Sequence, residues 1–261
     1  MNCGLRRTLI LRRAIISDIH GNLAALEAVL ADIQTQKVDQ ILCLGDVIGY
    51  GPNPLECYKL TKAEASIILM GNHEQALYED GGERFHQRAK AAINWTYRQF
   101  IETDEGQALL ETIRLLDSSY TRGDVLCVHG SPLDPVEEYI MPQDAFQLKK
   151  MSYQWVLVKQ IAFCGHTHLP GVFEENKRKF IPSYTIENGT YWLDANVKAI
   201  INVGSVGQPR DGNNKACYVI LDETDVVFYR RVQYDLEKTL IRFQEVPELH
   251  FSLADRLKTG H

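Results

Sequence analysis

The chain has 261 residues, of which 45% are hydrophobic and 24% charged, and its formal net charge is −6. These values are typical of a globular protein long enough for one large domain, and no apolar run is long enough to cross a bilayer. Nonspecific nucleic-acid binding requires concentrated Lys and Arg. The composition therefore argues against an extended nucleic acid and against a membrane as partners.

The N-terminal stretch 5–13 has an apolar segment too short for a secretory signal, and no small-residue cleavage site follows it. We expect it to lead directly into the first strand. Six cysteines occur without a CxxC spacing, and Cys43, Cys127 and Cys164 lie inside apolar runs, where they act as small hydrophobes. These features predict free thiols and a cytoplasmic location.

The first third of the chain alternates short apolar runs with helical patterns. β-Branched runs that end at Ser17, Gly45 and Gly71 predict buried strands. Helical spacing over 23–33, which Asn22 can cap, and a shorter pattern over 55–62 predict the helices between them. The loop 49–54 is rich in turn-forming residues. Strands separated by helices predict βαβ units.

The middle of the chain contains a helical segment without strand-like runs at about 84–116, with helices expected over 89–100 and 105–116. We interpret it as an insertion that covers one side of a pocket. Apolar runs over 125–128 and 161–164 predict two more strands, and a helix is expected over 142–150.

The last third shows strand patterns over 171–180, 191–203, 216–222 and 226–234, followed by a helix over 236–243. This order predicts a second, meander-like sheet. No internal repeat or linker divides the chain. We therefore predict a single domain, 1–261, with an α/β architecture of two sheets and helices outside them.

Five of the apolar runs end at residues whose side chains bind metals well. The residues are Asp18, His20, Asp46, Asn72, His129, His166 and His168. An unpaired charge in an apolar setting is costly, so these ends are expected to converge in a pocket of nitrogen and oxygen donors. Seven donors suit two ions that share one carboxylate. The mixed donor set favours Mn, Fe, Zn, Ni or Co over Ca or Mg.

The order of these motifs resembles the calcineurin-like metallophosphoesterases. The motifs are Asp18-x-His20, Gly45-Asp46, Gly71-Asn72-His73-Glu74, His129 and Gly165-His166-x-His168. The segment 202–210 is similar to the glycine-rich strand end of the small bacterial and archaeal branch. The resemblance implies a four-layer α-β-β-α sandwich of two mixed sheets flanked by helices. It also implies two divalent transition-metal ions, with Mn the first expectation.

The resemblance assigns a role to each ligand. Asp18, His20 and His168 would hold the first ion, and Asn72, His129 and His166 the second. Asp46 would bridge the two ions. His73 would be the catalytic residue, which protonates the leaving oxygen or stabilises charge on the phosphoryl group.

Several other residues have weaker predicted roles. Neighbouring Glu74 is not a ligand in the family pattern and could orient His73. Asn22 fits a substrate-binding position or simply caps its helix, and Arg210 contacts the substrate or makes a surface ion pair. Tyr50 and Asn53 could line the mouth of the pocket. Three histidines lie outside every motif and are predicted to be solvated or structural: His86, His250 and His261.

The implied activity is hydrolysis of phosphate esters by a metal-bridging hydroxide, without a covalent enzyme intermediate. A phosphodiesterase or phosphatase acting on small soluble substrates, nucleotides among them, is the first interpretation. A dinucleoside polyphosphate hydrolase of the diadenosine tetraphosphate type is the alternative. A non-enzymatic protein-binding scaffold is the contrasting class, but such a relative departs from the full histidine set, whereas His20 and His73 are both present.

Overall fold

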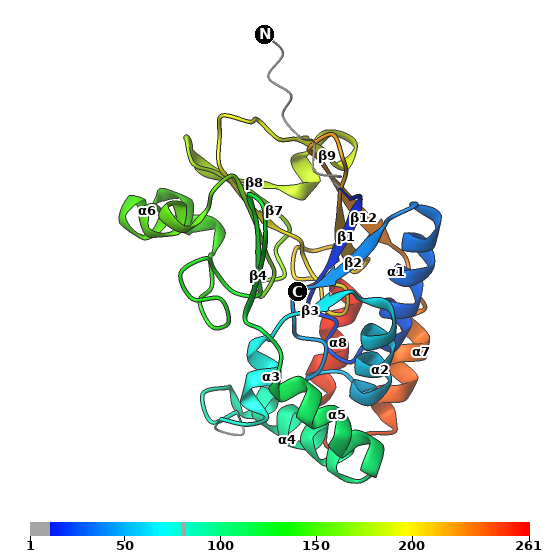
Figure 1. The fold of residues 1–261 in the computed structure, drawn as a ribbon. Helices are drawn as coiled ribbons and strands as arrows, with labels where there is room; N and C mark the ends of the chain where they lie inside the picture. Colours follow the sequence, from blue (N-terminus) through cyan, green and yellow to red (C-terminus); the bar gives the residue numbers. More distant parts are fainter. Residues whose placement is uncertain (1–10, 80–81) are drawn as a thin grey trace.

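The computed structural model describes residues 11–79 and 82–261. The part of the predicted leader over 5–10 lies outside the described residues. The described chain forms two six-stranded sheets that face each other, with helices on their outer sides (Figure 1). The predicted sandwich of two mixed sheets flanked by helices is therefore confirmed.

The first sheet combines parallel and antiparallel strands in the order β3-β2-β1-β11-β12-β9. Its strands are β1 (Arg13–Ile16), β2 (Gln40–Cys43), β3 (Ile67–Ile68), β9 (Thr190–Trp192), β11 (Ala216–Leu221) and β12 (Val226–Val232). Strand β1 pairs in parallel with β2 and antiparallel with β11, where Ile15 lies opposite Val219. The N-terminal βαβ units and the C-terminal strands thus share one sheet.

The second sheet has the order β4-β5-β6-β10-β7-β8. Its strands are β4 (Ser119–Arg122), β5 (Val125–Val128), β6 (Ile161–Cys164), β7 (Gly171–Glu174), β8 (Lys177–Pro182) and β10 (Ala199–Asn202). The predicted separate meander of C-terminal strands is wrong, because these strands divide between both sheets. Strand patterns indicate which segments are extended but not which distant strand each one pairs with.

Helices cover both outer faces of the sandwich (Figure 1). Helices α1 (Leu23–Thr35), α2 (Pro54–Glu64) and α7 (Leu236–Gln244) lie beside the first sheet, and α6 (Leu148–Leu157) lies beside the second. The Asn22 side chain accepts the Ala25 N–H at 3.2 Å, which confirms the predicted cap of α1. The helix predicted over 142–150 is instead a short 3₁₀ turn, η1 (Pro142–Phe146), followed by α6. The backbone leaves helical geometry between them at Gln147, where ψ is 79°.

A third group of helices lies at one end of the sandwich, lowest in Figure 1. It contains α3 (Asn72–Ala76), α4 (Gln87–Ile101), α5 (Asp104–Arg114) and α8 (Phe251–Thr259). Helices α4 and α5 form where a helical pair was predicted, whereas the sequence analysis missed α3, α8 and strand β4. Two further 3₁₀ turns are η2 (Ser183–Thr185) and η3 (Glu187–Gly189). That α4 and α5 are an insertion in a single domain stays a prediction.

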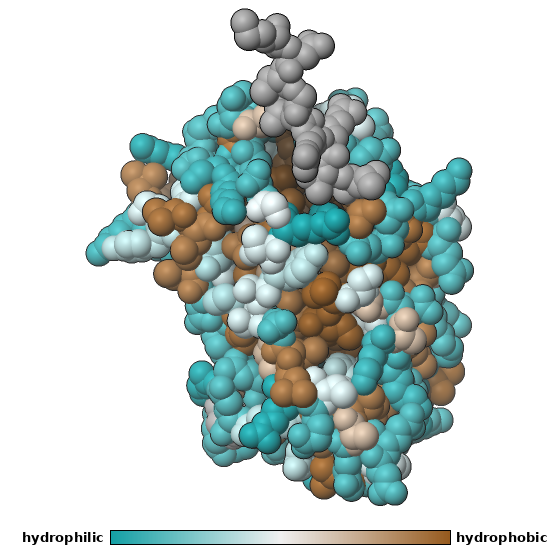
Figure 2. Space-filling view, viewed as in Figure 1, coloured by the Kyte–Doolittle hydropathy of each residue, from teal (hydrophilic) through white to brown (hydrophobic). Residues whose placement is uncertain are grey.

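Buried aliphatic side chains fill the space between the two sheets. Ile15, Leu42, Phe163, Ile201 and Val219 are all at most 2% exposed, and burying each such side chain contributes about 1.5–3 kcal/mol. The face drawn in Figure 2 mixes hydrophilic and hydrophobic residues, and one group of hydrophobic residues lies near its centre. No helix in the described part of the chain has the length and apolar character needed to span a membrane.

Candidate metal centre

Polar residues that follow the strands of both sheets lie close together. Asp18 follows β1, Asp46 follows β2, His129 follows β5 and His166 follows β6. Backbone hydrogen bonds join the loops: Asp18 N–H donates to Gly45 O at 3.0 Å, and His20 N–H donates to Asp46 O at 2.9 Å. Parallel strands place their carboxyl ends at one edge of a sheet. The facing arrangement of two such edges therefore brings all these side chains together.

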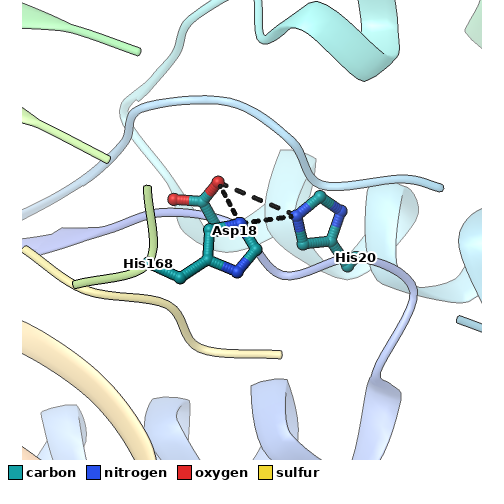
Figure 3. A group of neighbouring side chains, drawn as sticks. All are labelled: Asp18, His20 and His168. Atoms are coloured by element: carbon teal, nitrogen blue, oxygen red, sulfur yellow. Dashed lines mark hydrogen bonds and ion pairs between the residues drawn. The ribbon is translucent and has the colours of Figure 1, made fainter. Parts of the chain in front are cut away.

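Asp18, His20 and His168 form the first cluster (Figure 3). The His168 Nε2 atom lies 3.1 Å from both Asp18 Oδ1 and His20 Nε2, and His20 Nε2 lies 3.7 Å from Asp18 Oδ1. Asp18 Oδ1 is buried and accepts no hydrogen bond from the described residues. Ligands about 2.0–2.2 Å from one metal ion lie roughly 3–3.5 Å apart. The three donor atoms therefore fit a transition-metal ion.

The second cluster contains Asp46, His129 and His166, with Asn72 beside them. The His129 Nε2 atom lies 3.0 Å from His166 Nδ1, 3.2 Å from Asn72 Oδ1 and 3.4 Å from Asp46 Oδ2. Asp46 Oδ2 also lies 3.7 Å from His20 Nε2 of the first cluster. One carboxylate oxygen thus stands between the two groups of donors.

Hydrogen bonds from the outer ring nitrogens orient the histidines. His20 Nδ1 bonds to Ile48 O at 3.2 Å, His168 Nδ1 to Gln208 O at 2.6 Å, and His166 Nε2 to Glu137 O at 3.2 Å. A carbonyl oxygen only accepts, so the ring nitrogen that faces it must carry the proton. The other nitrogen of each ring is left with a lone pair directed at its cluster, which is the arrangement that ligating histidines need.

The backbone is held in the left-handed region at five of the donor residues. The φ angles are 54° at Asp18, 48° at His20, 51° at Asp46, 62° at His166 and 61° at His168. Non-glycine residues adopt this conformation uncommonly, and it persists where surrounding structure holds it in place. Each of these turns directs a side chain inward immediately after an extended segment.

The acidic side chains of the site, Asp18 and Asp46, are held in their charged form. Burial would raise the pKa of Asp46, but the nearby His129 and His73 hold it well below its usual range. Burial would lower the pKa of His129, but the charges of Asp46 and Asp18 and a hydrogen bond with Asp46 raise it to about 9. Burial lowers the pKa of His166 to about 3, so this ring is neutral. Two buried carboxylates beside the neutral ring of His166 favour a bound cation.

His73 is the second residue of the short helix α3, and its ring centroid lies 4.7 Å from that of His20. Its Nε2 atom lies 3.9 Å from Asp46 Oδ2, and its ring meets the edges of Tyr50 and Phe85 at centroid distances of 4.4 and 4.9 Å. Burial lowers the pKa of His73 to about 4. One potential ligand atom from each of His73, His20 and Asp46 lies within 4.8 Å of the other two. The part of the chain that leads into α4 thus covers one side of the site through Phe85.

Glu74 does not orient the ring of His73, contrary to the suggestion from the sequence. Its Oε2 accepts the N–H groups of Asp46 at 2.7 Å and Gly71 at 3.0 Å, and its Oε1 accepts those of Val47 at 2.9 Å and Ile48 at 3.2 Å. Glu74 therefore holds the loop that carries Asp46.

The residues with weaker predicted roles lie around the site. Asn22 Oδ1 accepts from Ala25 and Thr239, and Asn22 Nδ2 donates to Gly207 O at 2.9 Å, so its substrate role stays a prediction. Asn53 lies at the start of α2, where its side chain donates to Glu56, and its place at the mouth of the pocket stays a prediction. His250 caps α8 by accepting the Ser252 N–H, as a structural residue.

Two tyrosines outside the motifs lie beside histidines of the two clusters. Tyr139 stacks on His166 with ring centroids 3.6 Å apart and an interplanar angle of 21°. Tyr50, which was predicted near the mouth of the pocket, lies 4.6 Å from the His20 ring. A tyrosine in a loop carries no distinctive sequence signal, so only the folded contacts reveal Tyr139.

Comparison with known proteins identifies the family. Residues 11–225 match the calcineurin-like phosphoesterase superfamily domain. The chain belongs to this family. This calcineurin-like phosphoesterase is 37% identical to an uncharacterized protein of Methanocaldococcus jannaschii over 95% of its own length and 97% of the relative's. A solved metallophosphoesterase from Sphaerobacter thermophilus is 35% identical, with a TM-score of 0.82 over 96% of this chain and 99% of that one.

A shorter segment of this phosphoesterase is similar to an enzyme that is named for its substrate. A symmetrical bis(5'-nucleosyl)-tetraphosphatase from Erwinia tasmaniensis is 30% identical over 113 residues, which are 37% of this chain and 41% of that enzyme. Family membership makes the protein a phosphoester hydrolase, and the family normally binds divalent metals. The donor clusters are candidate ligand sets for such ions.

Proposed function

We propose that the protein is a dinuclear-metal-dependent hydrolase of small phosphate esters. Asp18, His20 and His168 would hold one divalent ion, Asn72, His129 and His166 the other, and Asp46 both. The observation that carries the proposal is the position of Asp46 Oδ2, 3.7 Å from His20 Nε2 and 3.4 Å from His129 Nε2. A carboxylate shared between two groups of donors is the arrangement of two-metal phosphoesterase sites.

The residues around the clusters supply the rest of the chemistry. Two bound ions lower the pKa of water to roughly 7 and balance the charge of the phosphoryl oxygens. Phosphate brings negative charge close to His73, which favours its protonated form although burial alone disfavours it. His73 then protonates the leaving oxygen or stabilises the phosphoryl group through Nε2–H. Arg210 is the proposed side chain for binding the substrate.

A second candidate is hydrolysis of dinucleoside polyphosphates. The observation in its favour is the 30% identity to a symmetrical bis(5'-nucleosyl)-tetraphosphatase, whose matched segment covers 37% of this chain. The non-enzymatic scaffold is disfavoured because both His20 and His73 lie in the site. Mn is the proposed physiological metal. The free, buried cysteines among the described residues support the predicted cytoplasmic location.

A metal analysis and a substrate panel test the proposal. The purified protein should contain up to two transition-metal equivalents, and added Mn should raise hydrolysis of at least one of four substrates: p-nitrophenyl phosphate, bis-p-nitrophenyl phosphate, a cyclic nucleotide and diadenosine tetraphosphate. Asp46→Asn should lower the content of both ions and abolish turnover, whereas Asp104→Asn on the exposed start of α5 should change neither. Absence of bound transition metal together with no Mn-stimulated hydrolysis would overturn the proposal.

A further inference from the structure

A cavity of about 880 Å³ lies beside the metal centre. Its lining comes from four segments of the chain: the loop that contains Tyr50, the start of α4, the loop that contains Arg210, and the C-terminal helix α8 with His261. The volume is within the range of sites that hold a nucleotide-sized ligand. His86 and His261, which the sequence placed outside every motif, line this cavity.

Tyr50 and Arg210 connect the cavity to the metal centre. The Tyr50 ring lines the cavity and lies 4.6 Å from the His20 ring and 4.4 Å from the His73 ring. The Arg210 guanidinium lies 6.0 Å from the centre of the Tyr50 ring. The backbone N–H of Arg210 donates to the backbone carbonyl of His168 at 3.4 Å. A substrate bound at the metal clusters could therefore extend directly past Tyr50 into the cavity.

The cavity gathers positive charge that lacks acidic partners. Arg88, Arg210 and Arg256 line it, and none of the three makes an ion pair with an acidic side chain among residues 11–79 and 82–261. Arg88 donates to Ser252 Oγ at 3.1 Å, and Arg210 donates to Gln208 Oε1 at 2.8 Å. These neutral partners leave the charges uncompensated.

Two further observations point to an anion. Arg88, Arg210 and Arg256 line the same cavity, and in addition to burial the positive charges of Arg210 and Arg88 lower the pKa of Arg256. The acid in the lining, Asp255, pairs instead with Lys258 at 2.7 Å. The first turn of α4 contains no acidic residue, and its N–H groups add to the positive potential. Like charges held together in this way favour a multiply charged anion.

We propose that this cavity is a subsite for the phosphate chain of the substrate beyond the phosphoryl group that reacts. The proposal deepens the proposed function, on which it rests, by assigning a substrate class: phosphate esters that carry further phosphoryl groups, such as nucleoside polyphosphates. Arg88, Arg210 and Arg256 would pair with the additional phosphates, and Tyr50 would separate the subsite from the reacting group.

Binding of inorganic tripolyphosphate to the metal-free protein tests the subsite independently of catalysis. Calorimetry in the presence of EDTA should show binding to the wild-type protein, and the double variant Arg88→Gln/Arg256→Gln should bind at least tenfold more weakly, since a charge-assisted contact contributes about that factor. Arg98→Gln is the matched control because Arg98 is an exposed residue at the other end of α4. Thermal melting should show that all variants fold. Absence of binding to the wild-type protein, or equal affinity in the double variant, would overturn the proposal.

Kinetics of the Mn-loaded enzyme separate this inference from the proposed function. The double variant should lose at least ten times more kcat/KM on diadenosine tetraphosphate than on p-nitrophenyl phosphate, while Arg98→Gln should keep the ratio unchanged. An unchanged ratio in the double variant would contradict the subsite although the enzyme is active. If the wild-type protein hydrolyses none of the four panel substrates, the proposed function fails, and the tripolyphosphate measurement still decides whether the anion site exists.

Discussion

Glu74 holds the backbone of Asp46 by accepting its N–H at 2.7 Å. The same carboxylate accepts three more backbone N–H groups. This buried acid therefore fixes the loop that follows β2. The backbone of Asp46 lies in the left-handed region and needs such a support, because this conformation is unfavourable on its own. Glu74 therefore supports the loop of Asp46 and makes no hydrogen bond to the ring of its neighbour His73.

Glu74→Gln should destabilise the protein and weaken both metal sites. A glutamine presents an NH₂ group to backbone donors that need acceptors, and unsatisfied buried donors cost about 1–3 kcal/mol. Urea unfolding should show a lower free energy of unfolding, and metal content should decrease. Glu79→Gln, whose side chain is half exposed on the same segment, is the control and should change neither. Unchanged stability and metal content in Glu74→Gln would contradict the assigned role.

His73→Ala should reduce turnover while metal content stays near normal. Loss of a general acid typically lowers the rate by about 10²–10⁴-fold, and the effect should be largest on substrates with poor leaving groups. Steady-state kinetics on p-nitrophenyl phosphate and on an alkyl phosphate measure this difference. Full activity on the alkyl phosphate would show that His73 has another role, and loss of one metal equivalent would show that it is a ligand.

Gly49→Ala should impair activity because the added methyl group would collide with the ring of His73, the proposed catalytic residue. A Cβ atom at Gly49, where φ is 81°, would lie 2.0 Å from His73 Nδ1. Gly123→Ala is a matched control: φ is 64° there and nothing lies within 4 Å of the added atom. Both variants should lose about 1 kcal/mol of stability from backbone strain, but only Gly49→Ala should lose kcat. Equal kcat in the two variants would argue against the His73 position.

Asp32→Asn should destabilise the protein at neutral pH but not in acid. Asp32 on α1 accepts from Tyr218 at 2.6 Å and from Arg230 at 2.7 Å. Burial raises the pKa of Asp32, but these hydrogen bonds outweigh it and lower the pKa below 3.8. The carboxylate therefore stabilises the fold above the unfolded pKa of about 3.9, and this contribution is lost as the pH falls through the lower folded value.

Melting temperatures at pH 7 and pH 3 check the Asp32 prediction. The difference between the wild-type protein and Asp32→Asn should be clear at pH 7 and should shrink at pH 3, which lies below the unfolded-state pKa of about 3.9. Asp235→Asn can serve as a control because asparagine also caps a helix. A difference that is the same at both pH values would show that Asp32 acts without its charge.

Local sequence patterns determined which residues could meet at a metal site. Asp18, Asp46, His129 and His166 each follow a short apolar run, and an unpaired charge at the end of a buried strand is costly, so their convergence is predictable from the sequence. The clusters around Asp46 have the donors that the motifs indicated. Which ion each donor binds stays a prediction.

Only the tertiary structure decided what surrounds those donors. Pairing between distant strands placed β11 beside β1 instead of in a second sheet, because hydrogen bonds between strands depend on partners that local periodicity does not specify. Packing of α8 against α4 placed Arg256 near Arg88 and Arg210 and created the basic cavity, although these arginines are far apart in the sequence. The residue types that bind a metal are a property of short segments, whereas the shape and charge of the adjoining space depend on long-range packing.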